Sequence, residues 1–210
     1  MKIGVYGGTF DPIHMGHLIV AEEARLRLKF NMVLFAPARL PWMKCPQTVS
    51  SPHHRLEMLK LAVASNPFFH ISTVDLENPG PSFTAETMRA LKQEYGDSGN
   101  LYFILGVDSL KDLPKWHEPH KIVSYGKLVA VARPGYEELD WKQLEMAIPQ
   151  AKDNIILIKG PLIDISSTEI RRRVAEGISI RYLVPEAVEK YIFEQGLYTK
   201  KQGGRDDKEL

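Results

Sequence analysis

The chain has 210 residues, of which 44% are hydrophobic and 25% are charged, as in ordinary globular proteins. Its 27 Lys and Arg residues nearly balance its 26 Asp and Glu residues, so the net charge is +1. This composition excludes wholesale disorder, and the small net charge argues against a protein that coats nucleic acid or an anionic membrane. The single Cys45 excludes an intrachain disulfide, and no apolar run approaches the roughly 18 residues of a membrane span. Without a secretion signal, the chain is expected to be a soluble, cytoplasmic protein.

Short apolar runs typical of strands alternate with helical patterns along the chain. In chain order we expect a strand at 3–6, a helix at 17–29, strand 32–36, helix 52–65, strand 69–74, helix 83–95, strands 101–105 and 127–132, a helix near 140–147, strand 154–158, and helices 167–176 and 185–194. Ser82 or Thr84 is the expected cap of the helix at 83–95. This alternation predicts an α/β protein, a single domain on a doubly wound parallel sheet. The domain is expected to span residues 1–198, and the polar segment 199–210 to form a flexible tail.

Ligands of such sheets bind at the carboxyl ends of strands, and the first loop of this kind carries the strongest signal. It reads Gly7-Gly8-Thr9-Phe10-Asp11-Pro12-Ile13-His14-Met15-Gly16-His17. Adjacent glycines let the backbone approach a ligand closely. The two histidines share one face at a helix start, beside N–H groups and the positive end of the helix dipole, which suits phosphate. Two histidines are too few ligands for a metal site, so none is expected.

A second candidate anion site lies at Ile165-Ser166-Ser167-Thr168-Glu169-Ile170-Arg171. Any of its three hydroxyl residues can cap the helix that begins here, and a well-capped helix alone would account for them. The functional interpretation adds that the hydroxyls, the first N–H groups of the helix and Arg171 bind phosphate together. Arg172 and Arg173 point elsewhere and are expected on a solvated face.

The two segments together resemble the signatures of the bacterial nucleotidyltransferases that carry a His-x-Gly-His motif. Within that superfamily the chain is similar to the nicotinate-mononucleotide adenylyltransferases, from residue 2 to about Tyr198. Further matching runs are Pro41-Trp42-Met43-Lys44, His54-Arg55-Leu56-Glu57-Met58, Pro81-Ser82-Phe83-Thr84, Ile104-Leu105-Gly106-Val107-Asp108, Pro114-Lys115-Trp116-His117 and Val131-Ala132-Arg133-Pro134-Gly135.

This resemblance implies a Rossmann-like nucleotidyltransferase fold and a reaction of NAD biosynthesis, in which ATP and nicotinate mononucleotide give nicotinate adenine dinucleotide and pyrophosphate. It implies that His17 acts on the transition state, and that His14 and Arg171 assist it. The implied ATP site comprises Gly7, Gly8, Thr9, Phe10, His14, His17, Gly106, Asp108, Ile165, Ser166, Ser167, Thr168 and Arg171. Mg²⁺ is expected to accompany ATP as part of the substrate.

For the mononucleotide, the resemblance implies contacts with Thr9, Lys44, Thr84, Asp108, Trp116, His117 and Arg133. Trp116 offers a flat face to the nicotinate ring, although a Trp is as often a core anchor. Thr84 and the backbone near it are the implied partners of the pyridine carboxylate. One departure lies in the loop Pro41-Trp42-Met43-Lys44, where many members read Pro-Pro-His-Lys. The phosphate therefore has to be held by Lys44 alone, or with help from His53, His54 or Arg55.

The implied chemistry needs no Ser-His-Asp arrangement, because a phosphate with a second pKa of about 6 is already an anionic nucleophile at pH 7. Alternatives are a nicotinamide mononucleotide or phosphopantetheine adenylyltransferase, a cytidylyltransferase, an enzyme akin to class I aminoacyl-tRNA synthetases, and a nucleotide-binding module without turnover. The +1 charge argues against a tRNA partner. We expect small-molecule substrates and neither nucleic acid nor membrane as partners; the oligomeric state stays open, a homo-oligomer included.

Overall fold

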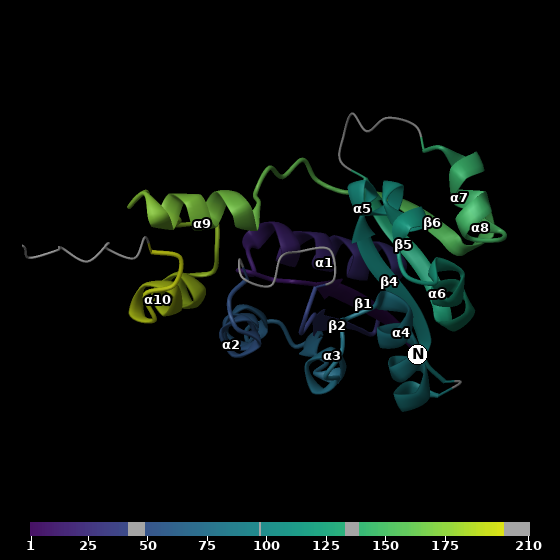
Figure 1. Cartoon of the computed structure of the whole chain (residues 1–210), viewed down its shortest axis with the longest axis horizontal. Coiled ribbons are helices and arrows are strands. Elements are labelled where there is room, and N and C mark those ends of the chain that lie inside the picture. The colour runs from purple at the N-terminus through teal and green to yellow at the C-terminus, as the bar shows by residue number, and fades with distance from the viewer. Residues whose placement is uncertain (42–48, 97, 133–138, 200–210) are drawn as a thin grey trace, which may run out of the picture.

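A computed structural model describes residues 1–41, 49–96, 98–132 and 139–199 of the chain. Within these residues the strands form one parallel sheet in the order β3-β2-β1-β4-β5-β6, with helices on both faces (Figure 1). The strands are β1 (Lys2–Gly8), β2 (Met32–Pro37), β3 (Phe69–Ile71), β4 (Asn100–Gly106), β5 (Gly126–Ala132) and β6 (Ile155–Lys159). The strand order reverses between β1 and β4, which confirms the predicted doubly wound sheet and marks where ligands bind in such folds.

The helices alternate with these strands. They are α1 (Met15–Leu28), α2 (Pro52–Val63), α3 (Val74–Glu77), α4 (Thr84–Tyr95), α5 (Val107–Lys111), a 3-10 helix (Leu113–Lys115), α6 (Pro119–Tyr125), α7 (Trp141–Ala147), α8 (Ala151–Asn154), α9 (Ser167–Ala175) and α10 (Glu186–Glu194). None of the described helices is long and apolar enough to cross a membrane.

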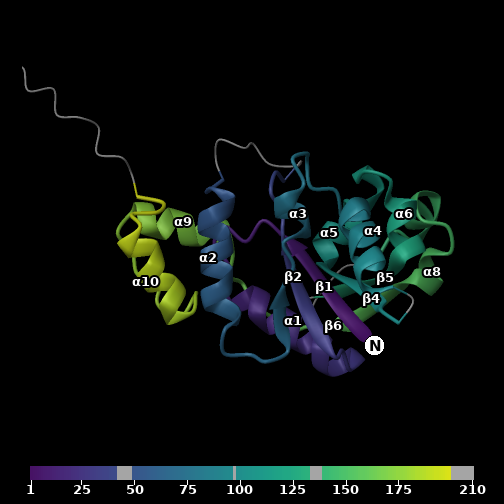
Figure 2. The same cartoon turned by 90° about the horizontal axis from the view of Figure 1, so that it is seen from below.

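Alternate residues of each central strand enter two separate cores. In β2, Val33 and Phe35 pack with α1, α2, α9 and α10, whereas Leu34 and Ala36 pack with the helices from α4 to α8. Successive side chains of a strand point to opposite faces, so a strand covered on both faces reads as an unbroken apolar run. Figure 2 shows α9 and α10 beside α2, so the C-terminal helices complete the first of these layers.

Two details of the sequence prediction are wrong. The strand expected at 69–74 ends at Ile71, because β3 is an edge strand that pairs only with Val33–Phe35 of β2, and α3 follows it. Neither Ser82 nor Thr84 caps α4: Thr84 is already helical, and the Ser82 hydroxyl instead accepts the N–H of Arg39 at 2.9 Å. The tail expected at 199–210 lies outside the described residues apart from Thr199.

Gly126 opens β5 where the chain runs too close to β4 for a side chain. A Cβ atom there would collide with the carbonyl oxygen of Leu101 and lie 2.7 Å from Cε of Met88. We therefore expect Gly126→Ala to lower the free energy of unfolding by about 1–3 kcal/mol, as overpacked cores do. Gly80→Ala is the matched control, because its Cβ would lie 3.6 Å from Asn78 and meet no closer atom. Urea denaturation measures both variants, and an unchanged midpoint for Gly126→Ala would contradict this account.

Candidate active site

The loop between β1 and α1 is shaped by close packing of aromatic rings against the strand end. A Cβ atom on Gly7 would lie 2.8 Å from the ring of Phe103, and one on Gly8 would lie 3.0 Å from the ring of Phe10. Phe10 itself is buried and has a φ of 50°, which turns the chain sharply after the strand. The glycines thus allow two rings to lie against the backbone and form one wall of a pocket.

His14 and His17 form a reciprocal cap at the start of α1. The His17 backbone N–H donates to Nδ1 of His14 at 3.4 Å, and the His14 N–H donates to Nδ1 of His17 at 3.2 Å. The two rings stack with centroids 3.6 Å apart. Because both Nδ1 atoms accept, a neutral imidazole at either position carries its proton on Nε2. Burial lowers the pKa of His14 to about 4, against a smaller opposing effect of its backbone hydrogen bond, so His14 is a neutral donor at pH 7.

The buried carboxylate of Asp11 joins three distant parts of the chain. Oδ1 accepts the hydroxyl of Tyr198 at 2.6 Å, and Oδ2 accepts the backbone N–H of Ser50 at 3.1 Å. Burial and the neighbouring Asp11 carboxylate raise the pKa of Tyr198 well above its usual range, so this phenol stays a donor. The first loop is therefore fixed by the C-terminal end of the described chain and by the segment before α2.

The second candidate anion site, residues 165–171, is hydrogen-bonded directly to the loop between β1 and α1. Ser166 is the cap of α9 and accepts the N–H of Glu169 at 3.2 Å, while Ser167 donates to the carbonyl of Pro12 at 2.9 Å. Arg171 donates to the Asp11 carbonyl at 2.7 Å and to Oγ1 of Thr168 at 3.4 Å. These contacts use only some of the five N–H donors of the guanidinium. They also orient Arg171 along the edge of the first loop.

Arg172 and Arg173 lie on the exposed side of α9, as expected. Arg172 pairs with Glu169 at 2.7 Å and also with Glu176, and Arg173 pairs with Glu169 at 3.0 Å. The positive charge of this arginine run is thus balanced along the helix itself.

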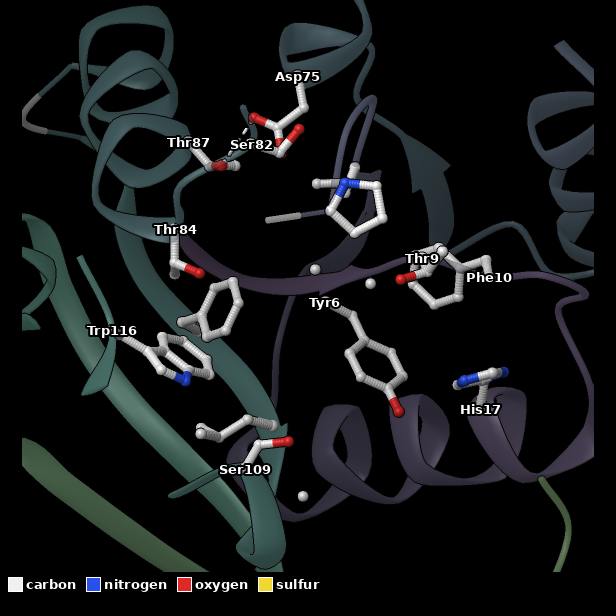
Figure 3. A pocket seen from close by; sticks show the side chains of 18 residues that line it. Tyr6, Thr9, Phe10, His17, Asp75, Ser82, Thr84, Thr87, Ser109 and Trp116 are labelled. Carbon is white, nitrogen blue, oxygen red and sulfur yellow. Dashed lines mark hydrogen bonds between the residues drawn. The ribbon is translucent and has the colours of Figure 1, made fainter. Parts of the chain in front are cut away.

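A pocket of about 330 Å³ lies at the carboxyl ends of β1 and β4. Its walls come from the first loop, from the ends of β2 and β4, and from α3, α4, α5 and the loop after the 3-10 helix: Tyr6, Gly7, Gly8, Thr9, Phe10, His17, Ala36, Ala38, Pro41, Asp75, Ser82, Thr84, Thr87, Phe103, Leu105, Gly106, Ser109 and Trp116. Figure 3 shows His17 and Phe10 at one end, and Asp75, Ser82, Thr84 and Thr87 gathered at the other.

Trp116 serves both as a packing residue and as a pocket wall. Its ring meets Phe103 edge to face with centroids 6.2 Å apart, and it packs against the core on the α4 side of the sheet. Its Nε1 is buried without a hydrogen-bond partner among the described residues. The neighbouring His117 is stacked on Phe83 at 4.2 Å, outside the pocket wall.

The structure brings together part of the predicted set. Eight of the predicted residues line the pocket: Gly7, Gly8, Thr9, Phe10, His17, Thr84, Gly106 and Trp116. The others that are described lie outside its wall, namely His14, Asp108, His117, Ile165, Ser166, Ser167, Thr168 and Arg171. Lys44 and Arg133 lie outside the described residues. The binding roles of all these residues stay predictions.

The suggestion that Arg55 helps to replace the missing phosphate-binding histidine is wrong, whereas the suggestions of His53 and His54 stay predictions. The guanidinium of Arg55 is fully buried and donates to four backbone carbonyls, those of Thr9, Ala38, Arg39 and Ser50, at 2.6–3.0 Å. His54 shares a hydrogen bond of 2.9 Å with the hydroxyl of Tyr191. The Arg55 side chain thus holds the backbone around the site.

Asp75, Ser82 and Thr87, at the far end of the pocket, were not predicted as site residues from the sequence. Asp75 directly follows the strand predicted at 69–74, so its place at a strand's carboxyl end was a usable signal. Thr87 follows Thr84 by three residues and therefore shares its helix face.

Comparisons with known proteins agree with this architecture. The cytidylyltransferase-like family matches residues 5–173. A probable nicotinate-nucleotide adenylyltransferase of Thermomicrobium roseum is 48% identical over 94% of this chain and 91% of its own length, and one of Geobacillus thermodenitrificans is 43% identical over 94% and 86%. The solved structure of Plasmodium falciparum nicotinic acid mononucleotide adenylyltransferase complexed with NaAD has a TM-score of 0.74 and 22% identity, covering 94% of this chain and 97% of that one. At that identity it supports the fold.

The chain has the parallel sheet of a nucleotidyltransferase of the cytidylyltransferase-like family. The loops before α1 and α9 meet at the switch point of this sheet, as in that family. A sequence identity of 48% to a relative over 94% of this chain is far above what a shared fold alone requires. The chain belongs to the nicotinate-nucleotide adenylyltransferase family.

The buried Asp11–Tyr198 contact gives a stability prediction. Tyr198→Phe keeps the ring but leaves one Asp11 oxygen buried without its donor, so we expect a loss of about 1–3 kcal/mol in the free energy of unfolding. Tyr182→Phe is the control, because Tyr182 is 82% exposed. Urea denaturation compares the two variants, and equal midpoints would show that Tyr198 contributes nothing at Asp11.

Proposed function

We propose that the chain transfers the adenylyl group of ATP to nicotinate mononucleotide, giving nicotinate adenine dinucleotide and pyrophosphate, a step of NAD biosynthesis. The observation that carries the proposal is a pocket with the His17 imidazole at one end and an indole beside a helix start at the other. Such a pocket suits two phosphorylated substrates placed end to end. The names of the relatives support it, as do the Plasmodium falciparum structures complexed with NaAD and with APC.

The reaction requires positioning and charge neutralisation rather than a general base. A phosphate oxygen of the mononucleotide attacks the α-phosphorus of ATP, a new P–O bond forms, and the bond to the pyrophosphate oxygen breaks in line. Because both substrates are polyanions, their approach has to be offset by donors and cations of the protein. We assign His17 to the transition state at the α-phosphate, and His14 and Arg171 to the ATP phosphates.

The N-terminal ends of α1 and α9 support these assignments. Ser167 and Arg171 bind the backbone of Pro12 and Asp11, so the two helix starts lie against one loop, where the positive ends of both helix dipoles favour an anion. Mg²⁺ enters with ATP as part of the substrate. Asp108 and Gly106, at the end of β4, are assigned to the nucleotide.

The far end of the pocket suits the pyridine ring. Trp116 offers the face of its ring to the pocket. Thr84 is the first residue of α4, and the preceding Phe83 has no side-chain oxygen to cap this helix. The helix dipole there favours an anion, so we place the pyridine carboxylate at the start of α4. Lys44 is proposed to contact the mononucleotide phosphate, and Arg133 is proposed as a further contact to the mononucleotide.

A pyrophosphate-release assay with Mg²⁺ and ATP tests the proposal. Nicotinate mononucleotide, nicotinamide mononucleotide and phosphopantetheine are compared in parallel, and nicotinate mononucleotide is expected to give the highest kcat/KM. Release with phosphopantetheine alone would identify a different transferase. Nucleotide binding without release from any acceptor would identify a binding module.

His17→Ala is expected to lower kcat by about 10²–10³, the usual loss for one donor to a transition state, with little change in KM. The steady-state rates of the purified variant measure this effect. His70→Ala is the control, since His70 is exposed on the edge strand β3. A raised KM with an intact kcat would show that His17 only binds substrate.

Trp116→Ala is expected to raise KM for the mononucleotide about tenfold or more, because stacking of a base on an aromatic ring contributes about 1–3 kcal/mol. KM for ATP should change less. Trp116→Phe is the matched control, since it keeps an aromatic face and removes only an N–H without a partner among the described residues. A larger effect on ATP would overturn the assignment of this end of the pocket.

A further inference from the structure

The pocket wall contains a buried carboxyl group that the proposed mechanism does not use. Asp75 on α3 is 8% exposed and lines the pocket. The hydroxyl of Thr87 donates to its Oδ1 at 2.7 Å, which leaves Oδ2 to meet whatever fills this end of the pocket. Figure 3 shows the pair beside Ser82 and close to Thr84, opposite the end occupied by His17.

The charged groups around α3 are engaged with other partners. Arg39, after β2, donates to the carbonyls of Leu76 and Asn78 at 3.3 and 3.4 Å. Glu77, on α3 itself, accepts the hydroxyl of Thr73, and Glu86, on α4, pairs with Arg89 at 2.8 Å. Asp75 therefore depends on the Thr87 hydroxyl for stabilisation. Burial raises the pKa of Asp75 to about 6, with the Thr87 hydrogen bond opposing it.

A second carboxylate in this space changes the protonation of Asp75. If nicotinate mononucleotide binds as proposed, its pyridine carboxylate lies at the start of α4, at the same end of the pocket as Asp75. Two carboxylates enclosed in one desolvated site do not both stay ionised, and a shared proton between them is the usual outcome. Nicotinamide mononucleotide has the same phosphate and ribose but a neutral amide, so its binding requires no shared proton.

We propose that Asp75 is a specificity-determining residue that takes up one proton from solvent when nicotinate mononucleotide binds and shares it with the pyridine carboxylate. A protonated Asp75 donates to nicotinate, whereas an ionised Asp75 accepts from the amide of nicotinamide. The choice between the two pyridines then depends on pH: nicotinate is favoured at low pH, and its advantage falls as pH rises. This inference rests on the proposed function.

The test is the ratio of KM for nicotinate mononucleotide to KM for nicotinamide mononucleotide between pH 6 and pH 8.5. The ratio cancels the titration of the shared phosphate and of distant groups. Above pH of about 6 it should rise in the wild-type protein by up to about tenfold per pH unit, the limit for uptake of one proton. In Asp75→Asn it should stay constant within about twofold, because the amide is neutral throughout.

The Asn variant is expected to fold. The raised pKa means that Asp75 favours the folded state at low pH and that this contribution is lost as pH rises through about 6. Asn accepts the same Thr87 hydrogen bond and carries no charge, so it removes that loss. Glu77→Gln, an exposed carboxylate on the same helix, is the matched control and should keep the wild-type slope. Thr87→Val removes the opposing hydrogen bond and should move the rise to higher pH.

Calorimetry gives an independent readout. Mononucleotide binding is measured at pH 7.5 in two buffers with different ionisation enthalpies, and nicotinate mononucleotide should take up about one proton more with wild-type protein than with Asp75→Asn. A pH-independent ratio, or the same slope in Asp75→Asn, would overturn the role of Asp75 while leaving adenylyl transfer intact. Absence of pyrophosphate release with both pyridine nucleotides would instead remove the proposed function.

Discussion

The buried carboxylate of Asp11 is the contact on which the geometry of the site depends. Its side chain takes hydrogen bonds from Tyr198 and Ser50, and its carbonyl takes one from Arg171. A charge withdrawn from water is tolerated only when its oxygens are satisfied, so each partner segment has to be in place for the loop to form. The first loop, the C-terminal segment and α9 are consequently parts of one cooperative unit, although they are far apart in the sequence.

Arg55 also holds the first loop, through the carbonyl of Thr9. Its four carbonyl contacts fix the backbone of Thr9 on one side and of Ala38 and Arg39 on the other. The loops that line the pocket are therefore fixed by a buried cation as well as by a buried carboxylate.

The sheet, its helices and the His14–His17 loop could be predicted because apolar periodicity and local motifs carry them. The Asp11 network could not, because contacts such as Tyr198 with Asp11 join residues that no local pattern relates. Arg55 shows the same limit: a cation beside a phosphate loop suggests binding, and only its burial shows that it serves the backbone. Asp75 was missed because the edge strand β3 ended early and a short helix turned the carboxyl into the pocket.

The reciprocal cap of His14 and His17 has a consequence for turnover. A cationic imidazole would hold a triphosphate tightly, and it would hold the departing pyrophosphate equally tightly. Burial keeps His14 uncharged at pH 7, so its ring adds no permanent positive charge at the start of α1. If the ATP phosphates bind there as proposed, a neutral His14 donates a hydrogen bond to them without the added attraction of a positive charge, which favours departure of the pyrophosphate.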